Sequence, residues 1–166
     1  MRLLETPGVG RDGARRLLAT FDSAPAIFDA SPATLRHACE PAIAAALGRL
    51  PAHFDARLQA ARDWLGGGAD RHVLTLGDPG YPPLLLQTAD PPLLLYVHGC
   101  TALLAAPSVA VVGSRSPTAQ GADNARAFAA ALSADGLVVV SGLALGIDGA
   151  AHDGALAGGA GTLAVV

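Results

Sequence analysis

The sequence predicts an α/β protein in which a small helical domain precedes a parallel β-sheet. Three observations predict this class. Short capped helices fill the first 65 residues, apolar strands alternate with helices from residue 109 onward, and those strands are apolar along their whole length, which is typical of parallel strands covered on both faces. The expected domains are a helical domain at 1–65, a linker and edge segment at 66–108, and the sheet domain at 109–166.

The composition is that of a globular chain with an aliphatic core. Of the 166 residues 51% are hydrophobic but only 4% are aromatic, and the formal net charge is −3. Residues 1–71 hold nine arginines against eight acidic residues, whereas residues 72–166 hold two against six. The overall charge therefore does not indicate a nucleic-acid partner, and any such partner has to be held by local geometry.

Neither a membrane segment nor a redox or metal site is expected. The longest apolar runs are too short to span a bilayer, and the N-terminus lacks the pattern of a signal peptide, so we expect a cytoplasmic protein with no membrane partner. Cys39 and Cys100 lie far apart without a CxxC motif, which predicts two buried, unpaired thiols. No metal or cofactor is expected.

Helix signals follow one another through the first domain. Ser23 and Ser31 are expected N-caps, Pro32 follows at a first helical position, and Pro41 and Pro51 open two further helices. The last and longest helix stops at the glycines of residues 66–68 and carries one apolar face, formed by Phe54, Leu58, Ala61 and Leu65.

The first residues read as a helix-hairpin-helix. In LLETPGVGRDGARRLLATF the hairpin falls at residues 7–10, and the second helix packs through Ala14, Leu17 and Leu18. Such hairpins direct backbone N–H groups at phosphates, and Arg15 and Arg16 add charge. Possible secondary DNA-binding residues are Gly8, Gly10 and Arg11. The alternative is a hairpin that serves only packing or protein interaction.

The middle segment has a different texture. HVLTLGDPGYPPLLLQTADPPLLLYVHG, residues 72–99, contains two short strand-like runs separated by proline pairs, which cannot continue a helix or occupy a central strand. We expect it to add edge structure to the sheet domain.

The sheet domain has a βαβαβ rhythm. The expected strands are 109–113, 137–142 and 162–166, and the expected helices are 118–135 and 146–159. Gly136 ends the first helix, whose buried face is expected to hold Ala125, Phe128, Ala129 and Leu132. Three parallel strands make the first half of a doubly wound, Rossmann-like domain, so we expect the sequence to be a fragment of a longer protein.

Two loops fall at the carboxyl ends of these strands, where such sheets bind ligands. They are GSRSPT at 113–118 and SGLALGID at 141–148. Gly113 permits a tight turn, Ser114 and Ser116 can donate hydrogen bonds to phosphate oxygens, and Arg115 can make a charge-assisted bidentate contact. The alternative is a purely structural turn, with Ser116 and Pro117 capping a helix.

The dinucleotide fingerprint is absent. It requires GxGxxG after the first strand and an acidic residue after the second, where this chain has GSRSPT and Ser141–Gly142. GGAGT at 158–162 is similar to phosphate-binding turns of phosphoribohydrolases, but it runs into a strand with no acidic residue after it, which favours a helix-to-strand turn. A nucleotide-processing enzyme of that class is the alternative function. Because no nucleophile is paired with a base, we expect no catalytic residue and no enzyme.

Three motifs carry a family resemblance. VAVVGSRSPT, VVVSGLALGIDGAAHDGAL and the upstream LGDPGYPPLLLQTADPPLLLYVHG are similar to the DNA-processing protein A family (DprA/Smf) over residues 72–166. The N-terminal hairpin resembles the sterile-alpha-motif-like domain that precedes the Rossmann-like domain of that family. The resemblance implies a DNA-processing protein that binds and protects single-stranded DNA, forms a homodimer and loads the RecA recombinase in DNA recombination during natural transformation (competence). The RecA and dimer surfaces are then expected beyond residue 166.

The resemblance also implies site residues. It places a phosphate pocket at Gly113, Ser114, Arg115 and Ser116, with Ser141 and Gly142 as its other wall and His152 as a further DNA contact. An alternative for His152 is a histidine stabilised by Asp148, an N-cap carboxylate one turn earlier. Asp153 stands where many family members have a basic residue, so one phosphate contact is expected to be lost.

Overall fold

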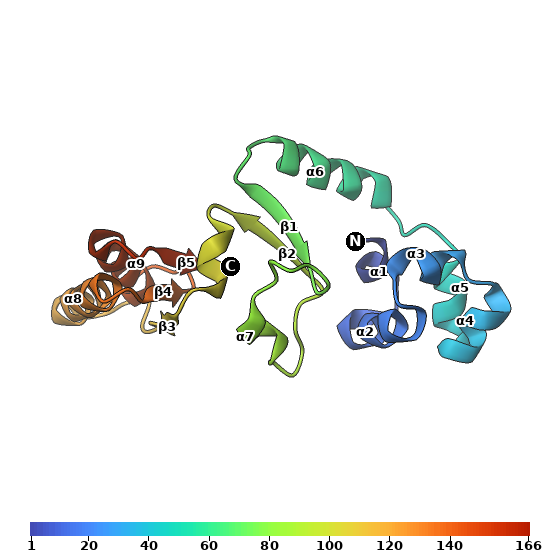
Figure 1. Cartoon of the computed structure of the whole chain (residues 1–166), viewed down its shortest axis with the longest axis horizontal. Coiled ribbons are helices and arrows are strands. Elements are labelled where there is room, and N and C mark those ends of the chain that lie inside the picture. Colours follow the sequence, from blue (N-terminus) through green and yellow to red (C-terminus); the bar gives the residue numbers. More distant parts are fainter. The chain divides into compact units, whose positions relative to one another are not determined.

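The computed structural model describes all residues, 1–166, and the chain divides after Gly99 into two compact units, Met1–Gly99 and Cys100–Val166 (Figure 1). Its helices are all too short or too polar to cross a bilayer.

Six helices build most of the first unit. They are α1 (Arg2–Glu5), α2 (Gly10–Phe21), α3 (Ala24–Asp29), α4 (Pro32–Ala38), α5 (Pro41–Leu47) and α6 (Phe54–Gly66). The predicted caps at Ser23 and Ser31 are confirmed, since their hydroxyls accept hydrogen bonds from the N–H groups of Ala26 and Thr34. Helix α6 starts three residues after Pro51.

The hairpin between α1 and α2 is present as expected. Gly8 and Gly10 have φ angles of 81° and 59°, in the left-handed region that favours glycine. Ala14 and Leu17 are buried in the helical core. The sequence pattern therefore gave the correct local fold here.

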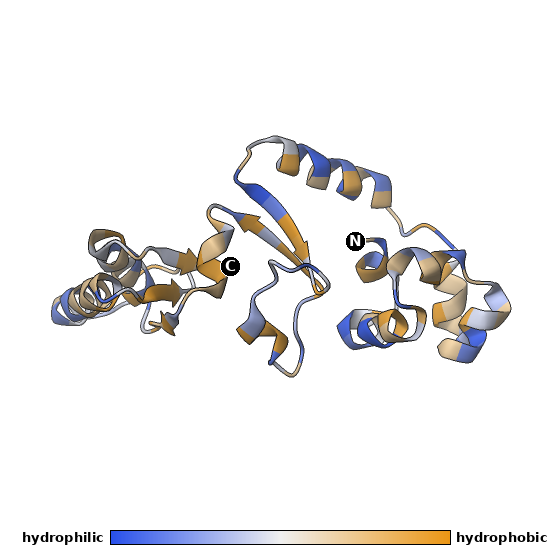
Figure 2. Cartoon of the chain, in the orientation of Figure 1, coloured by the Kyte–Doolittle hydropathy of each residue, from blue (hydrophilic) through white to orange (hydrophobic).

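Helix α6 is less buried than expected. Figure 2 shows polar and apolar residues alternating along it, but none of its residues is fully buried and Leu65 is exposed. Its firmest aromatic contact comes from Trp64, which packs edge-on against Tyr96 with ring centroids 5.2 Å apart.

The segment after α6 forms its own small sheet. Strands β1 (Arg71–Thr75) and β2 (Leu94–His98) pair antiparallel, with the short helix α7 (Pro83–Leu86) between them. Buried Leu93, next to β2, joins the core of the helices. The prediction that this segment adds edge structure to the second region is wrong, because β1 and β2 pair only with each other.

The second unit contains a three-stranded parallel sheet. After the 3₁₀ helix η1 (Thr101–Ala105) come β3 (Ser108–Ala110), α8 (Ala119–Ala134), β4 (Val138–Ser141), α9 (Ile147–Gly158) and β5 (Thr162–Ala164). The strand order is β3-β4-β5, as expected for the first half of a Rossmann-like fold. Thr118 caps α8, and Gly136 ends it with a φ of 88°.

Both helices cover the same face of the sheet. Val139 of β4 packs with Ala129 of α8 and with Ala151 and Ala155 of α9. Successive right-handed crossovers that step in one direction place their helices on one side. The expectation of a sheet covered on both faces is therefore corrected: Ala110, which follows Val109 along β3 and so points to the opposite face, is exposed.

Helices α8 and α9 approach so closely that only small residues fit between them. A Cβ at Gly154 would overlap the carbonyl oxygen of Arg126, and one at Gly158 would lie 2.5 Å from that of Ala130. The buried face of α8 is accordingly Ala125, Ala129 and Ser133. Phe128, predicted to be buried, is 68% exposed, because the narrow contact has no room for an aromatic ring. Leu132 is half-buried.

The cysteines also differ from expectation. Both are unpaired, but Cys39 is only half-buried and Cys100 is exposed. Burial raises the pKa of the Cys39 thiol, whose hydrogen points to the Leu35 carbonyl. The thiol therefore stays protonated and weakly reactive near neutral pH.

The helix contact gives a first testable prediction. Gly154→Ala should destabilise the second unit by about 1–3 kcal/mol, because the methyl group overlaps the α8 backbone. Gly149→Ala in the same helix is the control. Its Cβ would meet only the Ala144 carbonyl oxygen at 3.6 Å, so the gain in helix propensity should leave stability unchanged or raise it by up to about 1 kcal/mol. Calorimetry measures both, and equal effects would contradict the close contact.

Candidate nucleic-acid interface

The candidate site lies where β3 and β4 end. The Ser141 hydroxyl at the end of β4 donates a 2.7 Å hydrogen bond to the carbonyl of Val111, just after β3. Ser141 is 3% exposed. It therefore ties the two strand ends together beneath the site, and its hydroxyl proton is not free for a ligand.

The two loops that follow are joined by backbone contacts. The Ile147 N–H group donates a 3.0 Å hydrogen bond to the Ser114 carbonyl. A Cβ at Gly113 would lie 2.7 Å from the Ile147 side chain, and one at Gly146, whose φ is 89°, would lie 2.8 Å from the Arg115 carbonyl oxygen. Both glycines are required by this close approach, which makes residues 113–118 and 142–146 one surface.

The predicted pocket residues divide into exposed and buried groups. Residues 113–116 and Gly142 are exposed, so the structure brings them to the surface at the same edge of the sheet. The Ser114 hydroxyl accepts a 3.0 Å hydrogen bond from the N–H group of Ser116, which leaves its own proton available to a ligand. The surface is therefore rich in backbone N–H and hydroxyl donors.

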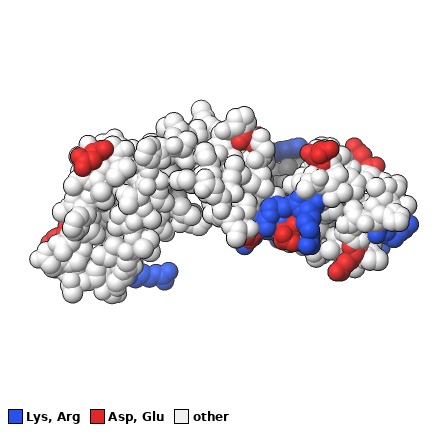
Figure 3. All heavy atoms as spheres, turned by 60° about the horizontal axis from the view of Figure 1, so that its bottom comes forward, with Lys and Arg blue, Asp and Glu red and all other residues white.

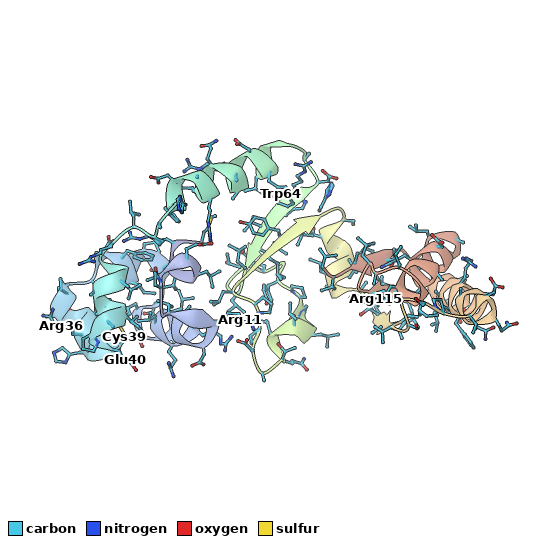
Figure 4. All side chains as sticks on the ribbon, turned by 180° about the vertical axis from the view of Figure 1, so that it is seen from behind. Arg11, Arg36, Cys39, Glu40, Trp64 and Arg115 are labelled. Carbon is cyan, nitrogen blue, oxygen red and sulfur yellow. The ribbon has the colours of Figure 1, made fainter.

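Arg115 is the cation of this surface (Figure 4). It is exposed and takes part in no ion pair. The other arginine of the unit, Arg126, lies 3.1 Å from Asp123 and 3.9 Å from Asp153. Arg115 alone among the basic groups of this unit is free to meet an anion.

A buried carboxylate supports the second loop from below. Asp148, in the first turn of α9, is 8% exposed and accepts a 3.4 Å hydrogen bond from the N–H group of Ala144. The N-cap of α9 is Gly146, which has no side chain to satisfy the helix N–H groups. Asp148 therefore shapes the loop and sits at the helix end where a negative charge is favoured.

His152 lies in the interior, 7% exposed. Its Nδ1 is 2.7 Å from the Thr162 hydroxyl, and that hydroxyl donates to the Val139 carbonyl. Nδ1 therefore carries the proton, and Nε2 has no partner. This position contradicts the predicted DNA contact by His152. It also gives no hydrogen bond to Asp148, so the alternative role is not seen either.

The hairpin residues are exposed, but their charges are largely paired. Arg11 lies 2.8 Å from Asp90, Arg15 also contacts Asp90, and Arg16 lies 3.0 Å from Asp12. Figure 3 shows basic and acidic side chains side by side on this unit. Gly8 and Gly10 are exposed as well. Sequence reasoning missed Asp90, because nothing in its neighbourhood indicates a partner some 75 residues away.

A hollow of about 180 Å³ lies beside the hairpin. Its walls are mostly apolar, including Val9, Leu17 and Ile43, and the one arginine in its lining is the Arg16 already paired with Asp12. It offers no group of converging polar atoms. Elsewhere, no three His, Cys, Asp or Glu side chains gather as a metal site.

The geometry of the second unit defines a class of protein: a Rossmann-like α/β protein with an anion-accepting surface at the carboxyl edge of its sheet. Residues 72–166 match the family model described as DNA recombination-mediator protein A, and the chain belongs to this family.

Similar proteins agree with that assignment. The chain is 47% identical over 89 residues to the DNA processing protein DprA of Streptococcus pneumoniae, covering 54% of this chain and 31% of the relative. It is 41% identical over 87 residues to protein Smf of Escherichia coli, covering 52% and 23%. The crystal structure of S. pneumoniae DprA superposes with a TM-score of 0.74 at 31% identity, covering 98% of this chain and 54% of that one. The chain thus spans a third or less of these curated relatives.

The arginine pair on Asp90 gives a pH prediction. A hydrogen bond from Arg15, helped by the charge of Arg11, lowers the pKa of the Asp90 carboxyl. Because the folded-state pKa is below the ordinary value, the stabilisation is complete above about pH 4 and is lost as pH falls through the lowered pKa. Asp90→Asn should therefore lower the melting temperature near neutral pH, with the difference vanishing in acid. Asp29→Asn, which removes an unpaired exposed carboxylate, should show no such loss. A difference that persists in acid would contradict the ion-pair origin.

Proposed function

We propose that the surface formed by residues 113–118 and 142–146 binds the sugar-phosphate backbone of single-stranded DNA. The observation that carries this proposal is the unpaired, exposed Arg115 on a turn locked to the N-terminal end of α9 by the Ile147–Ser114 hydrogen bond. A cation, free hydroxyl groups and a helix N-terminus together provide the donors that a phosphate group requires.

Membership of a recombination-mediator family supports DNA as the source of the phosphates. The surface is an open edge with backbone donors, and it carries no array of side chains suited to reading base edges in a duplex groove. A flexible single strand can place its phosphates on such a surface regardless of sequence. We therefore propose binding without sequence preference.

Catalysis is not part of the proposal. At this edge the Ser141 hydroxyl is bonded to a backbone carbonyl, the Ser114 hydroxyl contacts only a backbone N–H group, and His152 is buried away from both. No nucleophile has a base within reach. These contacts favour a binding protein over the alternative of a phosphoribohydrolase-like enzyme, and an assay for nucleoside monophosphate hydrolysis separates the two.

The finer roles follow from the same proposal. A recombination mediator delivers DNA to a recombinase, so we propose that the whole protein protects incoming strands, loads RecA in natural transformation and acts in the cytoplasm as a homodimer. We also propose a secondary DNA contact at Gly8, Gly10 and Arg11. Because Asp90 neutralises much of the arginine charge there, this contact should be weaker than the one at Arg115.

A matched pair of arginine variants tests the site. Arg115→Ala should weaken binding to oligo-dT about ten- to a hundredfold, the scale of losing a charge-assisted hydrogen bond of roughly 1.5–3 kcal/mol. Arg126→Ala, which removes an arginine already paired with Asp123 and Asp153, should change the affinity little. Fluorescence anisotropy gives both affinities and calorimetry both melting temperatures. Normal binding by Arg115→Ala would show that the turn is structural.

Salt dependence tests the backbone contact separately. The logarithm of the affinity for oligo-dT should fall linearly with the logarithm of the salt concentration, with a slope of about −0.7 per phosphate contact. In Arg115→Ala the slope should be smaller by about one contact. An affinity independent of salt would exclude phosphate binding.

A further inference from the structure

Two leucines stand out from the loop that faces Arg115's turn. Leu143 is 61% exposed and Leu145 is 84% exposed. Both lie within residues 142–146, which the Ile147–Ser114 hydrogen bond holds against the turn at residues 113–118. Apolar side chains are thus presented beside the one free cation of the unit, and the sheet core takes no part in holding them.

Leu143 is held in a costly conformation. Its φ of 57° lies in the left-handed region, where a leucine costs roughly 1–2 kcal/mol relative to ordinary backbone. The loop keeps this shape because Asp148 bonds to the N–H group of Ala144 and the Gly149 N–H group bonds to the Ala144 carbonyl. A glycine would adopt the same backbone without this cost, so packing and backbone geometry do not explain the leucine.

We propose that Leu143 and Leu145 contact the nucleobases of the strand whose phosphates Arg115 binds. This inference rests on the proposed function and adds a base-contacting role to the same surface. The faces of nucleobases are flat and apolar, and neither loop offers an aromatic side chain for stacking. The one carboxylate of the second loop region, Asp148, is buried, so no exposed negative charge opposes the strand.

This arrangement makes the contact tolerant of sequence. Leucine side chains make dispersion and hydrophobic contacts with any base, and they form no hydrogen bonds that distinguish one base from another. The strand is then held through its phosphates at the first loop and through its bases at the second. A ligand with phosphates but no bases satisfies only the first.

The experiment compares oligo-dT with an abasic strand of equal length, using the purified protein. The unchanged protein should bind oligo-dT more tightly than the abasic strand. Leu145→Ser should weaken oligo-dT binding about three- to tenfold, the scale of partly burying one leucine, and leave abasic binding unchanged. Arg115→Ala should weaken both. Leu156→Ser, which alters a leucine of α9 that is 69% exposed, is the matched control and should change neither.

Leu143→Gly separates ligand contact from folding. Because glycine relieves the backbone cost, the melting temperature should stay the same or rise while oligo-dT affinity falls. A melting temperature that drops would show that Leu143 is structural and overturn its assignment.

Three other outcomes overturn the inference. If Leu145→Ser weakens oligo-dT and abasic binding equally, or neither, the bases do not contact the leucines, although phosphate binding stands. If Leu145→Ser dissociates a self-associated form in sedimentation experiments without altering DNA affinity, the leucines bind a second copy of the chain. If the unchanged protein binds neither strand, the proposed function fails as well.

Discussion

The second unit depends on the backbone contact between α8 and α9. Gly154 and Gly158 allow α9 to lie against the carbonyl groups of α8, and the buried Ser133 reinforces the contact by donating to the Ala155 carbonyl and accepting from the Ala160 N–H group. With both helices fixed on one face, the loops that precede them are brought together at the same edge. The position of the candidate site is therefore a consequence of small residues that never touch a ligand.

The polar groups at that edge have divided roles. Ser141, Asp148 and Thr118 spend their hydrogen bonds on strand ends, loop backbone and the α8 cap, so they set the shape of the surface. Arg115 has no internal partner and remains available. Such a division keeps the surface rigid in the absence of ligand, which limits the entropy lost when a strand binds.

The sequence predicted the parts of the fold that local pattern controls. The capped helices, the hairpin and the order of parallel strands are as expected, because caps, glycines and apolar runs act on their own neighbours. Where contacts between distant elements decide, the predictions failed. Phe128 has the spacing of a buried residue, yet glycines some 26 residues later in α9 close the space it would need.

The site shows the same limit. The exposed turn at residues 113–116 was found from its residue types and its place after a strand. Its coupling to Ile147 was not, because close backbone approach leaves only a glycine as its sequence signal. His152 was misplaced because a hydrogen bond from Thr162 on a later strand draws it inward.

Trp64, packed against Tyr96, gives the protein an uneven optical signature. The chain has a single tryptophan and two tyrosines, Tyr81 and Tyr96, and all three belong to the unit Met1–Gly99. The unit Cys100–Val166 has none, so it contributes almost nothing to absorbance or emission excited near 280 nm. Intrinsic fluorescence would follow the unfolding of the first unit alone, and its agreement or disagreement with helix circular dichroism would report directly whether the two units unfold together.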